Sequence, residues 1–172
     1  PFVFIELFGI PPENYGWIFG SNAFGLIALS QVNGRLVRNV DPTKILRVCL
    51  ALSGVFSLFL IAAGLLNFGF WGIATAVFLF IASLGMIFPN STAGALAEQR
   101  QHAGSASALI GSLQYGLAAI ASSLVSYFNN GTTLSMTLTI GTCGVLAFFA
   151  LNLLVGRTKR ELAAAEEHTT FA

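Results

Sequence analysis

Long apolar segments separated by short polar ones constrain this sequence more than any other feature. Four of them cover about residues 44–66, 71–88, 104–128 and 134–155. The hydrocarbon core of a bilayer is about 30 Å thick, and a helix needs about 20 apolar residues to cross it. Each segment reaches about that length. The sequence therefore predicts a bundle of membrane-spanning helices.

The composition excludes a soluble domain. Charged residues make up 9% of the 172 residues and hydrophobic residues 55%, whereas soluble domains carry about 25% charged residues. The mean hydropathy is +0.79. The net charge of +1 does not indicate nucleic-acid binding, because the basic residues lie only in short loops. Cys49 and Cys143 both fall inside apolar segments, so we interpret them as small core residues.

The predicted fold class is all-α integral membrane, a transmembrane helix bundle with five complete spans plus the end of a sixth. The partial span covers about residues 1–10, and the prolines at 11 and 12 are expected to end it. The chain opens without Met and is already apolar, so we interpret it as a fragment whose start lies upstream. A polar tail, residues 156–172, is expected to form a short helix through 160–166. The complete spans are predicted at about 15–37, 44–66, 71–88, 104–128 and 134–155.

Loop charge predicts the direction of these spans. All Lys and Arg residues lie in or beside alternate connections, and the turns at 11–14, 67–70 and 129–133 have none. Cytoplasmic loops carry the excess of Lys and Arg. The 35–47 loop, the 98–102 hinge and the C-terminal tail are therefore predicted to be cytoplasmic. The residues expected to form an outer aromatic belt are Tyr15, Trp17, Trp71 and Tyr127.

Residues 88–119 join two spans through the charged hinge. After the hinge a row of small residues recurs at every fourth position: Gly104, Ala108, Ser112 and Gly116. Helices in lipid associate by close backbone approach along small residues, so we expect this row to pack against neighbouring helices. Pro89, just before the hinge, is interpreted either as a static helix end or as a gating hinge.

Five local stretches carry a family resemblance: Phe88-Pro89-Asn90-Ser91, Ala95-Leu96, residues 103–116, residues 1–6 with Gly9, and the loop sequence Asn33-Gly34-Arg35-Leu36. Together with the helix pattern, they resemble one half of a major facilitator transporter, and within that superfamily the bicyclomycin/chloramphenicol-resistance (Bcr/CflA) family. The resemblance implies helices seven (in part) to twelve, the C-terminal half of a major facilitator fold. The sequence departs from the superfamily loop pattern at Asp41-Pro42, where Gly and basic residues are preferred.

The resemblance further implies a secondary transporter for multidrug efflux and antibiotic resistance in a bacterial cytoplasmic (inner) membrane. Its partners would be a drug-like substrate, protons, the lipid bilayer and the missing N-terminal half, with no nucleic acid. The acidic residue used for proton coupling would lie in that N-terminal half, so antiport is implied by the family alone. Two alternatives stay open: a facilitator for another solute, such as a sugar or organic acid, and a non-transporting membrane scaffold.

Candidate residues for a substrate cavity are the polar and adaptable side chains within spans. A charged side chain at mid-membrane costs about 2.5–3.5 kcal/mol, so Glu6 needs either a partner or water. It either contacts a cationic drug or a proton in the cavity, or it reaches the outer water. The amides either line the cavity or join helices by hydrogen bonds worth roughly 0.6–2 kcal/mol. By analogy with cavity-lining helices of the superfamily, two Phe and one Met join them. The set is Phe2, Glu6, Asn22, Phe78, Met86, Asn90, Gln114 and Tyr115.

A second set marks the cytoplasmic loop: Asn33, Gly34, Arg35, Arg38 and Asp41. In one interpretation these residues set the orientation of the spans in the membrane and form a network of ion pairs in the loop that includes Arg47. In the other they help to lock the cytoplasmic gate of a transporter. Enzyme chemistry finds little support. The two histidines, His102 and His168, lie on polar stretches without Cys, His or Asp at metal-ligand spacing, and no phosphate-binding Gly loop is present. We therefore expect no enzyme activity, no metal and no cofactor.

Overall fold

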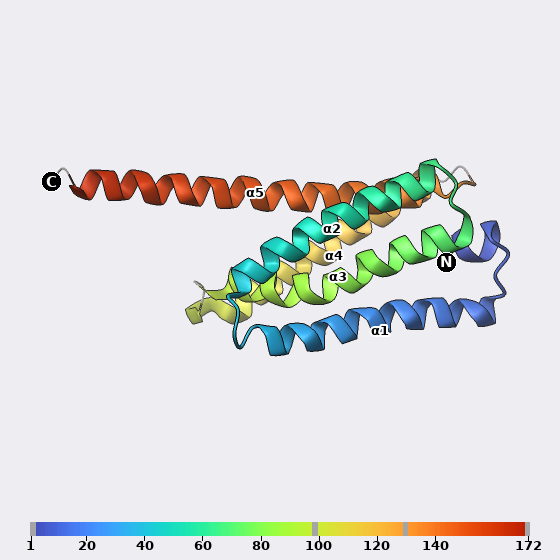
Figure 1. The fold of residues 1–172 in the computed structure, drawn as a ribbon, viewed down its shortest axis with the longest axis horizontal. Coiled ribbons are helices and arrows are strands. Elements are labelled where there is room, and N and C mark those ends of the chain that lie inside the picture. The colour runs from blue at the N-terminus through green and yellow to red at the C-terminus, as the bar shows by residue number, and fades with distance from the viewer. Residues whose placement is uncertain (1–2, 98–99, 129–130, 171–172) are drawn as a thin grey trace.

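The computed structural model describes residues 3–97, 100–128 and 131–170, with side chains of the last helix described as far as residue 153. These residues form helices and turns and no strand, which confirms the all-α class (Figure 1). The elements are a π-helical turn η1 (Val3–Leu7), α1 (Pro12–Leu36), α2 (Pro42–Leu65), α3 (Gly69–Ala97), a 3-10 turn η2 (Arg100–His102), α4 (Ala103–Tyr127) and α5 (Leu134–Thr170).

Two helices begin at prolines. Pro12 starts α1 and Pro42 starts α2, where a missing N–H costs nothing and the fixed φ angle suits the first turn. Asp41 caps α2, and its Oδ1 accepts a hydrogen bond from the backbone N–H of Thr43 at 2.7 Å. These helices therefore begin a few residues before the predicted positions 15 and 44.

Pro89 lies inside α3, which continues as a helix to Ala97. The interpretation of Pro89 as a helix end is therefore wrong, and the helix runs past the predicted span boundary at 88. A proline within a helix removes one backbone hydrogen bond and crowds the carbonyl four residues earlier, here that of Gly85. Similarly, α5 continues through the expected tail to Thr170, so the helix expected at 160–166 is part of α5.

Within the described parts of the chain, four helices are long and apolar enough to cross a membrane: α2, α3, α4 and the Leu134–Leu153 part of α5. The remaining long helix, α1, has 25 residues but is not among the four. Polar side chains such as Ser21 and Asn22 interrupt its apolar character. A fifth complete span over residues 15–37 therefore stays a prediction.

The core of the bundle is formed by three pairs of closely packed helices, α1 with α3, α3 with α2, and α2 with α5. The central helix α3 contacts both α1 and α2 extensively, and α2 in turn contacts α5 (Figure 1). Small residues make two of these crossings possible. A Cβ on Gly85 of α3 would collide with the backbone of Leu26 in α1, and a Cβ on Gly64 of α2 would collide with Thr137 of α5.

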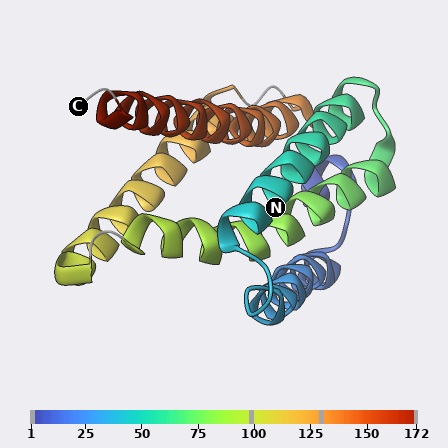
Figure 2. The ribbon, with the colours of Figure 1, turned by 60° about the vertical axis from the view of Figure 1, so that its left-hand side comes forward.

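In contrast, α4 stands apart from this core (Figure 2). None of its residues is buried, and it contacts α3 and α5 at few points. The predicted packing row is exposed, and no atom lies within 4 Å of a Cβ placed on Gly104 or Gly116. At 100° per residue the row faces away from Ala121 and Val125, which face α5. Among the residues that the structure describes, this row is exposed and not packed against a neighbouring helix, contrary to the prediction.

Candidate substrate cavity

A cavity of about 440 Å³ lies between α1 and α3 and is completed by η1 and the start of α5. Most of its wall comes from one face of α1, because residues 15, 18, 19, 22, 23, 26 and 27 recur at helical spacing. The lining residues are Phe4, Tyr15, Ile18, Phe19, Asn22, Ala23, Leu26, Ile27, Val77, Ile81 and Met136.

The backbone of α1 approaches α3 beside this cavity because Gly25 has no side chain. A Cβ at Gly25 would lie 2.8 Å from Cε2 of Phe78 and 3.2 Å from Cβ of Ala82. The Phe78 ring therefore occupies the space next to Gly25. Phe78 was predicted to face substrate, but it lies in the α1–α3 contact and is not part of the cavity wall.

The cavity offers mainly aromatic and aliphatic surface. Its polar groups are the half-buried amide of Asn22 and the phenol of Tyr15, and none of its lining side chains is charged. Small-molecule sites typically measure about 300–1,000 Å³, and combine apolar walls with a few polar groups that fix orientation. The arrangement is suited to an apolar compound with a small number of hydrogen-bonding groups.

Of the predicted cavity residues that the structure describes, only Asn22 lies in this wall. Glu6 lies on η1, is exposed, and is not among the lining residues. Phe2 lies outside the described residues. Gln114 and Tyr115 are exposed on α4, with Tyr115 81% exposed, and they do not meet the cavity. Their proposed contact with substrate stays a prediction.

Two predicted residues from different sets are joined by a buried hydrogen bond. Asn90 of α3 donates from Nδ2 to Oδ1 of Asn33 in α1 at 2.7 Å, and also to the carbonyl of Met86 at 2.8 Å. Both asparagines are only 4% exposed. Such a bond between helices in lipid contributes of the order of 0.6–2 kcal/mol. Asn33 and Asn90 therefore join α1 to α3, while substrate contact by Asn90 and a gating role for Asn33 stay predictions.

Met86 also lies in helix packing. Its sulfur is 3.7 Å from the thiol of Cys49 on α2, within a core cluster that includes Ile45 and Ile87. Cys49 is buried, as predicted, whereas Cys143 is exposed. Met86 is half-buried and does not line the cavity.

The cytoplasmic loop residues are largely solvent-facing. Gly34, Arg35 and Arg38 are exposed. The hydrogen bond from the backbone N–H of Thr43, together with the Thr43 side chain, holds the pKa of Asp41 below its ordinary value. Among the described residues Asp41 forms no ion pair with Arg35, Arg38 or Arg47. The expected ion-pair network is therefore not formed, and a gating role for this loop stays a prediction.

Sequence reasoning missed most of the cavity wall. Tyr15 was interpreted as part of an aromatic belt, and Phe4, Phe19 and Met136 were not singled out. The helical spacing of large residues along α1 was the available signal. It did not show which face of α1 meets α3, because α1 carries apolar residues on several sides, including exposed Trp17 and Phe24.

The fold and cavity describe a multi-pass membrane protein with an apolar site between helices. The chain is 35% identical over 155 residues to a Bicyclomycin resistance protein homolog of Haemophilus influenzae, which covers 90% of the chain and 39% of that protein. It is 28% identical over 154 residues to an Uncharacterized MFS-type transporter, YdgK, of Bacillus subtilis, with 88% and 38% covered. No family model and no solved structure matches the chain.

These matches confirm the resemblance to major facilitator transporters. The chain is homologous to the C-terminal part of the Haemophilus protein. It spans about two fifths of the length of both relatives, 39% and 38%. The Bacillus relative is named as a transporter, which agrees with the prediction that the chain is not an enzyme.

Proposed function

We propose that this chain is the C-terminal part of a secondary active transporter that exports drug-like compounds by alternating access, driven by proton antiport. The observation that carries the proposal is the similarity along 90% of the chain to a protein named for bicyclomycin resistance. Transport would proceed by rocking of this half against an N-terminal half around a site near the bilayer midplane.

The cavity between α1 and α3 supports a role in binding the exported compound. Its aromatic wall supplies adaptable apolar contact, and the Asn22 amide would fix orientation through one or two hydrogen bonds. Asn22 is therefore the strongest of the predicted substrate contacts. The assignment of protons as the coupling ion rests on the family resemblance.

The proposed location is the bacterial inner membrane. Arg35, Arg38, Lys44 and Arg47 surround the α1–α2 connection, which by loop charge is cytoplasmic. The same rule assigns the C-terminal tail, residues 156–172, to the cytoplasm. Residues 1–155 would then form the transmembrane part of this half.

The test is efflux of a fluorescent dye or bicyclomycin by cells that express the full-length transporter, measured with and without a proton uncoupler. We expect export that stops when the uncoupler is added. Export that persists would contradict proton coupling. Absence of export of any drug, with uptake of a sugar or organic acid instead, would favour a facilitator for another solute.

Matched variants separate a transporter from a scaffold. Asn22→Leu removes the cavity amide, whereas Asn152→Leu removes an exposed amide that bonds only within its own helix, to the carbonyl of Phe148. We expect Asn22→Leu to reduce export several-fold with normal membrane insertion, and Asn152→Leu to leave export unchanged. Equal export by both variants and the unaltered protein would overturn the assignment of this cavity.

A further inference from the structure

Helix α2 has one face that its neighbours leave open. It packs against α3 and α5, and its buried residues face these two helices, as Cys49 does beside Met86 of α3 and Ser57 beside Gly144 of α5. At 100° per residue, a set of exposed side chains falls within an arc of about 100° on the opposite side. The set is Lys44, Arg47, Val48, Ala51, Val55 and Leu58.

The chemistry of this open face changes along the helix. Lys44 and Arg47, near its start, are basic, and every later member of the set is aliphatic. Val48 is 60% exposed, and Val55 and Leu58 are each 59% exposed. Because α2 is long and apolar enough to cross a membrane, its basic end lies at a membrane surface and its aliphatic part in the hydrocarbon. A phospholipid presents the matching order, with a phosphate followed by acyl chains.

The end of α1 adds two more cations beside the start of α2. Arg35 lies in the last turn of α1, and Arg38 lies in the turn that follows; both are exposed. The connection is tight, since the backbone N–H of Val40 donates to the carbonyl of Leu36 at 3.0 Å and α2 begins at Pro42 (Figure 1). Residues 35–47 therefore gather their cationic side chains at one end of the bundle.

Little negative charge compensates these cations. Residues 35–47 contain four Lys and Arg residues and one acidic residue, Asp41, which gives a net charge of +3. The Asp41 carboxylate caps α2, and the nearby charge of Lys44 contributes to its lowered pKa. Glu6 and Glu13 lie before and in the first turn of α1, at the end of that helix opposite to Arg35. Within the described part of the chain, this cluster is therefore positively charged without ion-paired partners.

We propose that the α1–α2 connection and the open face of α2 together bind an anionic phospholipid, such as phosphatidylglycerol, of the adjoining leaflet. Its phosphate is held by Arg38, Lys44 and Arg47, because guanidinium and ammonium groups form charge-assisted hydrogen bonds to phosphate oxygens. One acyl chain lies along Val48 and Val55. Charge complementarity selects this occupant, since each Lys or Arg near an anionic lipid surface raises the affinity about fivefold. The proposal does not depend on the identity of the transported compound.

The test is the quenching of a fluorescent label by lipids that carry a doxyl group near the headgroup. The label is attached to Val40→Cys in the full-length transporter, with its other cysteines replaced by serine, in phosphatidylcholine nanodiscs. Doxyl-phosphatidylglycerol and doxyl-phosphatidylcholine are compared at equal mole fraction. We expect phosphatidylglycerol to be preferred about tenfold at low salt, as one or two cationic contacts give, and less at high salt. Equal quenching by both lipids at low salt would overturn the proposal.

The matched control places the label at the other end of the same helix, at Leu66→Cys. Leu66 is 66% exposed, and the adjoining turn, residues 67–70, has no Lys or Arg. We expect no preference for phosphatidylglycerol there. An equal preference at both ends of α2 would contradict a local binding surface.

The double variant Arg38→Gln, Lys44→Gln removes two of the contacts and leaves Arg35 and Arg47 to orient the helices. We expect its preference for phosphatidylglycerol to fall several-fold, whereas Lys44→Arg retains the charge and should retain the preference. An unchanged preference in the double variant would overturn the proposal. Inorganic phosphate separates a lipid from a soluble anion: at equal ionic strength it should displace no more doxyl-phosphatidylglycerol than chloride does. Stronger displacement by phosphate would identify a soluble phosphate as the occupant and overturn the choice of lipid.

Discussion

The α2–α5 crossing and helix α4 both carry rows of small residues, yet only the first is packed. In the crossing, a Cβ on Gly144 would collide with Ser57, and one on Gly141 would collide with Ile61. On α4, a Cβ on Gly104, Gly111 or Gly116 meets no atom within 4 Å. A small-residue row therefore permits close approach but does not determine which partner makes it.

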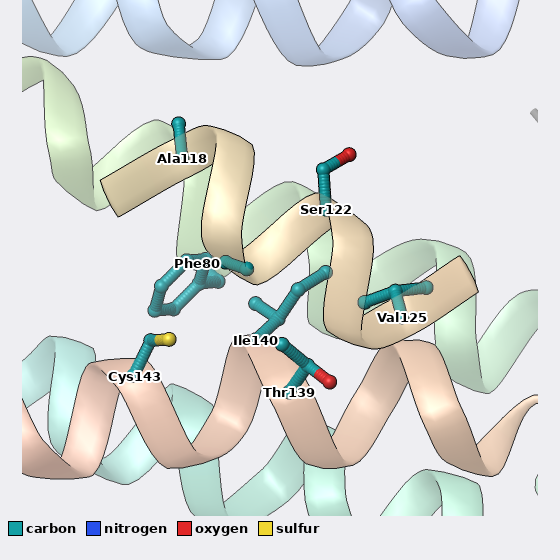
Figure 3. Close-up of a pocket in the computed structure, with 8 residues that line it drawn as sticks. Phe80, Ala118, Ser122, Val125, Thr139, Ile140 and Cys143 are labelled. Atoms are coloured by element: carbon teal, nitrogen blue, oxygen red, sulfur yellow. The ribbon is translucent and has the colours of Figure 1, made fainter. Parts of the chain in front are cut away.

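The difference lies in which helix surfaces meet among the described residues. The crossings α1–α3 and α2–α5 are closely packed, and in the first of them Asn33 and Asn90 face each other. The inner wall of α4 faces an apolar groove between α4 and α5 beside Phe80 (Figure 3), and its small-residue row faces outward. Among the residues that the structure describes, α4 is therefore the long helix with the least packing.

The largest expected effect is at Gly85, where the neighbour is the backbone of α1. Gly85→Val would force α1 and α3 apart, because the Leu26 carbonyl cannot rotate away as a side chain can. Overpacking of this kind costs about 1–3 kcal/mol or more. The free energy of unfolding in mixed micelles, followed by circular dichroism, measures the loss.

The control for this change is Gly94→Val in the same helix, where nothing lies within 4 Å of the added Cβ. It carries the same change in helix propensity. A similar loss from both variants would mean that the α1–α3 contact is not as close as described.

A second test compares the two small-residue rows directly. Gly144→Leu in the α2–α5 crossing should destabilise the chain by about 1–3 kcal/mol, since Ser57 and the ring of Phe80 lie where the side chain would be. Gly116→Leu on α4 should not destabilise the chain alone, because nothing lies within 4 Å of the added Cβ. Unfolding in mixed micelles again provides the measurement, and equal losses would remove the distinction between the rows.

Gly116→Ala tests whether the small-residue row on α4 is exposed, with a smaller added side chain than Leu. In the chain alone it should stabilise α4 by about 0.5–1 kcal/mol, because glycine is unfavourable in a helix interior. In the full-length transporter the sign should reverse if the row meets another helix. A gain of stability in both forms would show that the row stays free.

The buried amide pair should show a measurable coupling. In a double-mutant cycle of Asn33→Leu and Asn90→Leu, we expect an interaction energy of about 0.6–2 kcal/mol. Each single variant leaves the other amide without its partner across the helices, whereas the double variant does not. Strictly additive losses would contradict the hydrogen bond.

The smallest expected effect concerns the cap of α2. The pKa of Asp41 is lowered in the folded chain by hydrogen bonds from Thr43. Its contribution is therefore present above the unfolded pKa of about 4 and is lost as the pH falls through the lower folded value. The protection factors for hydrogen exchange at the start of α2 should fall as the pH drops through that interval. Asp41→Asn caps without titrating, so its protection factors should not fall there, and an identical pH dependence in both proteins would contradict the cap.

The helical membrane class and the order of the helices were predicted from the sequence, because segment length and hydropathy can be read locally along the chain. The resemblance to major facilitator transporters was found from short local stretches such as residues 103–116. The sequence also singled out Asn33 and Asn90 without indicating that they meet. It was wrong about Pro89, because the packing of α3 against α1 and α2 maintains the helix through the proline. The cavity wall was mostly missed, since apolar residues in lipid do not reveal which face of α1 contacts α3.

The central claim is that α2 and α5 form a closely packed pair while α4 packs loosely against the rest of the described chain. Spin labels on the exposed positions Leu58 and Phe149 report the α2–α5 distance, and labels on Leu117 and Leu146 report α4–α5. Pulsed electron resonance should give a narrow α2–α5 distribution in the chain and in the full-length form. The α4–α5 distribution should be broad in the chain and narrow in the full-length form, because regions with few buried contacts open most easily. Equal widths for both pairs in the chain alone would contradict the account.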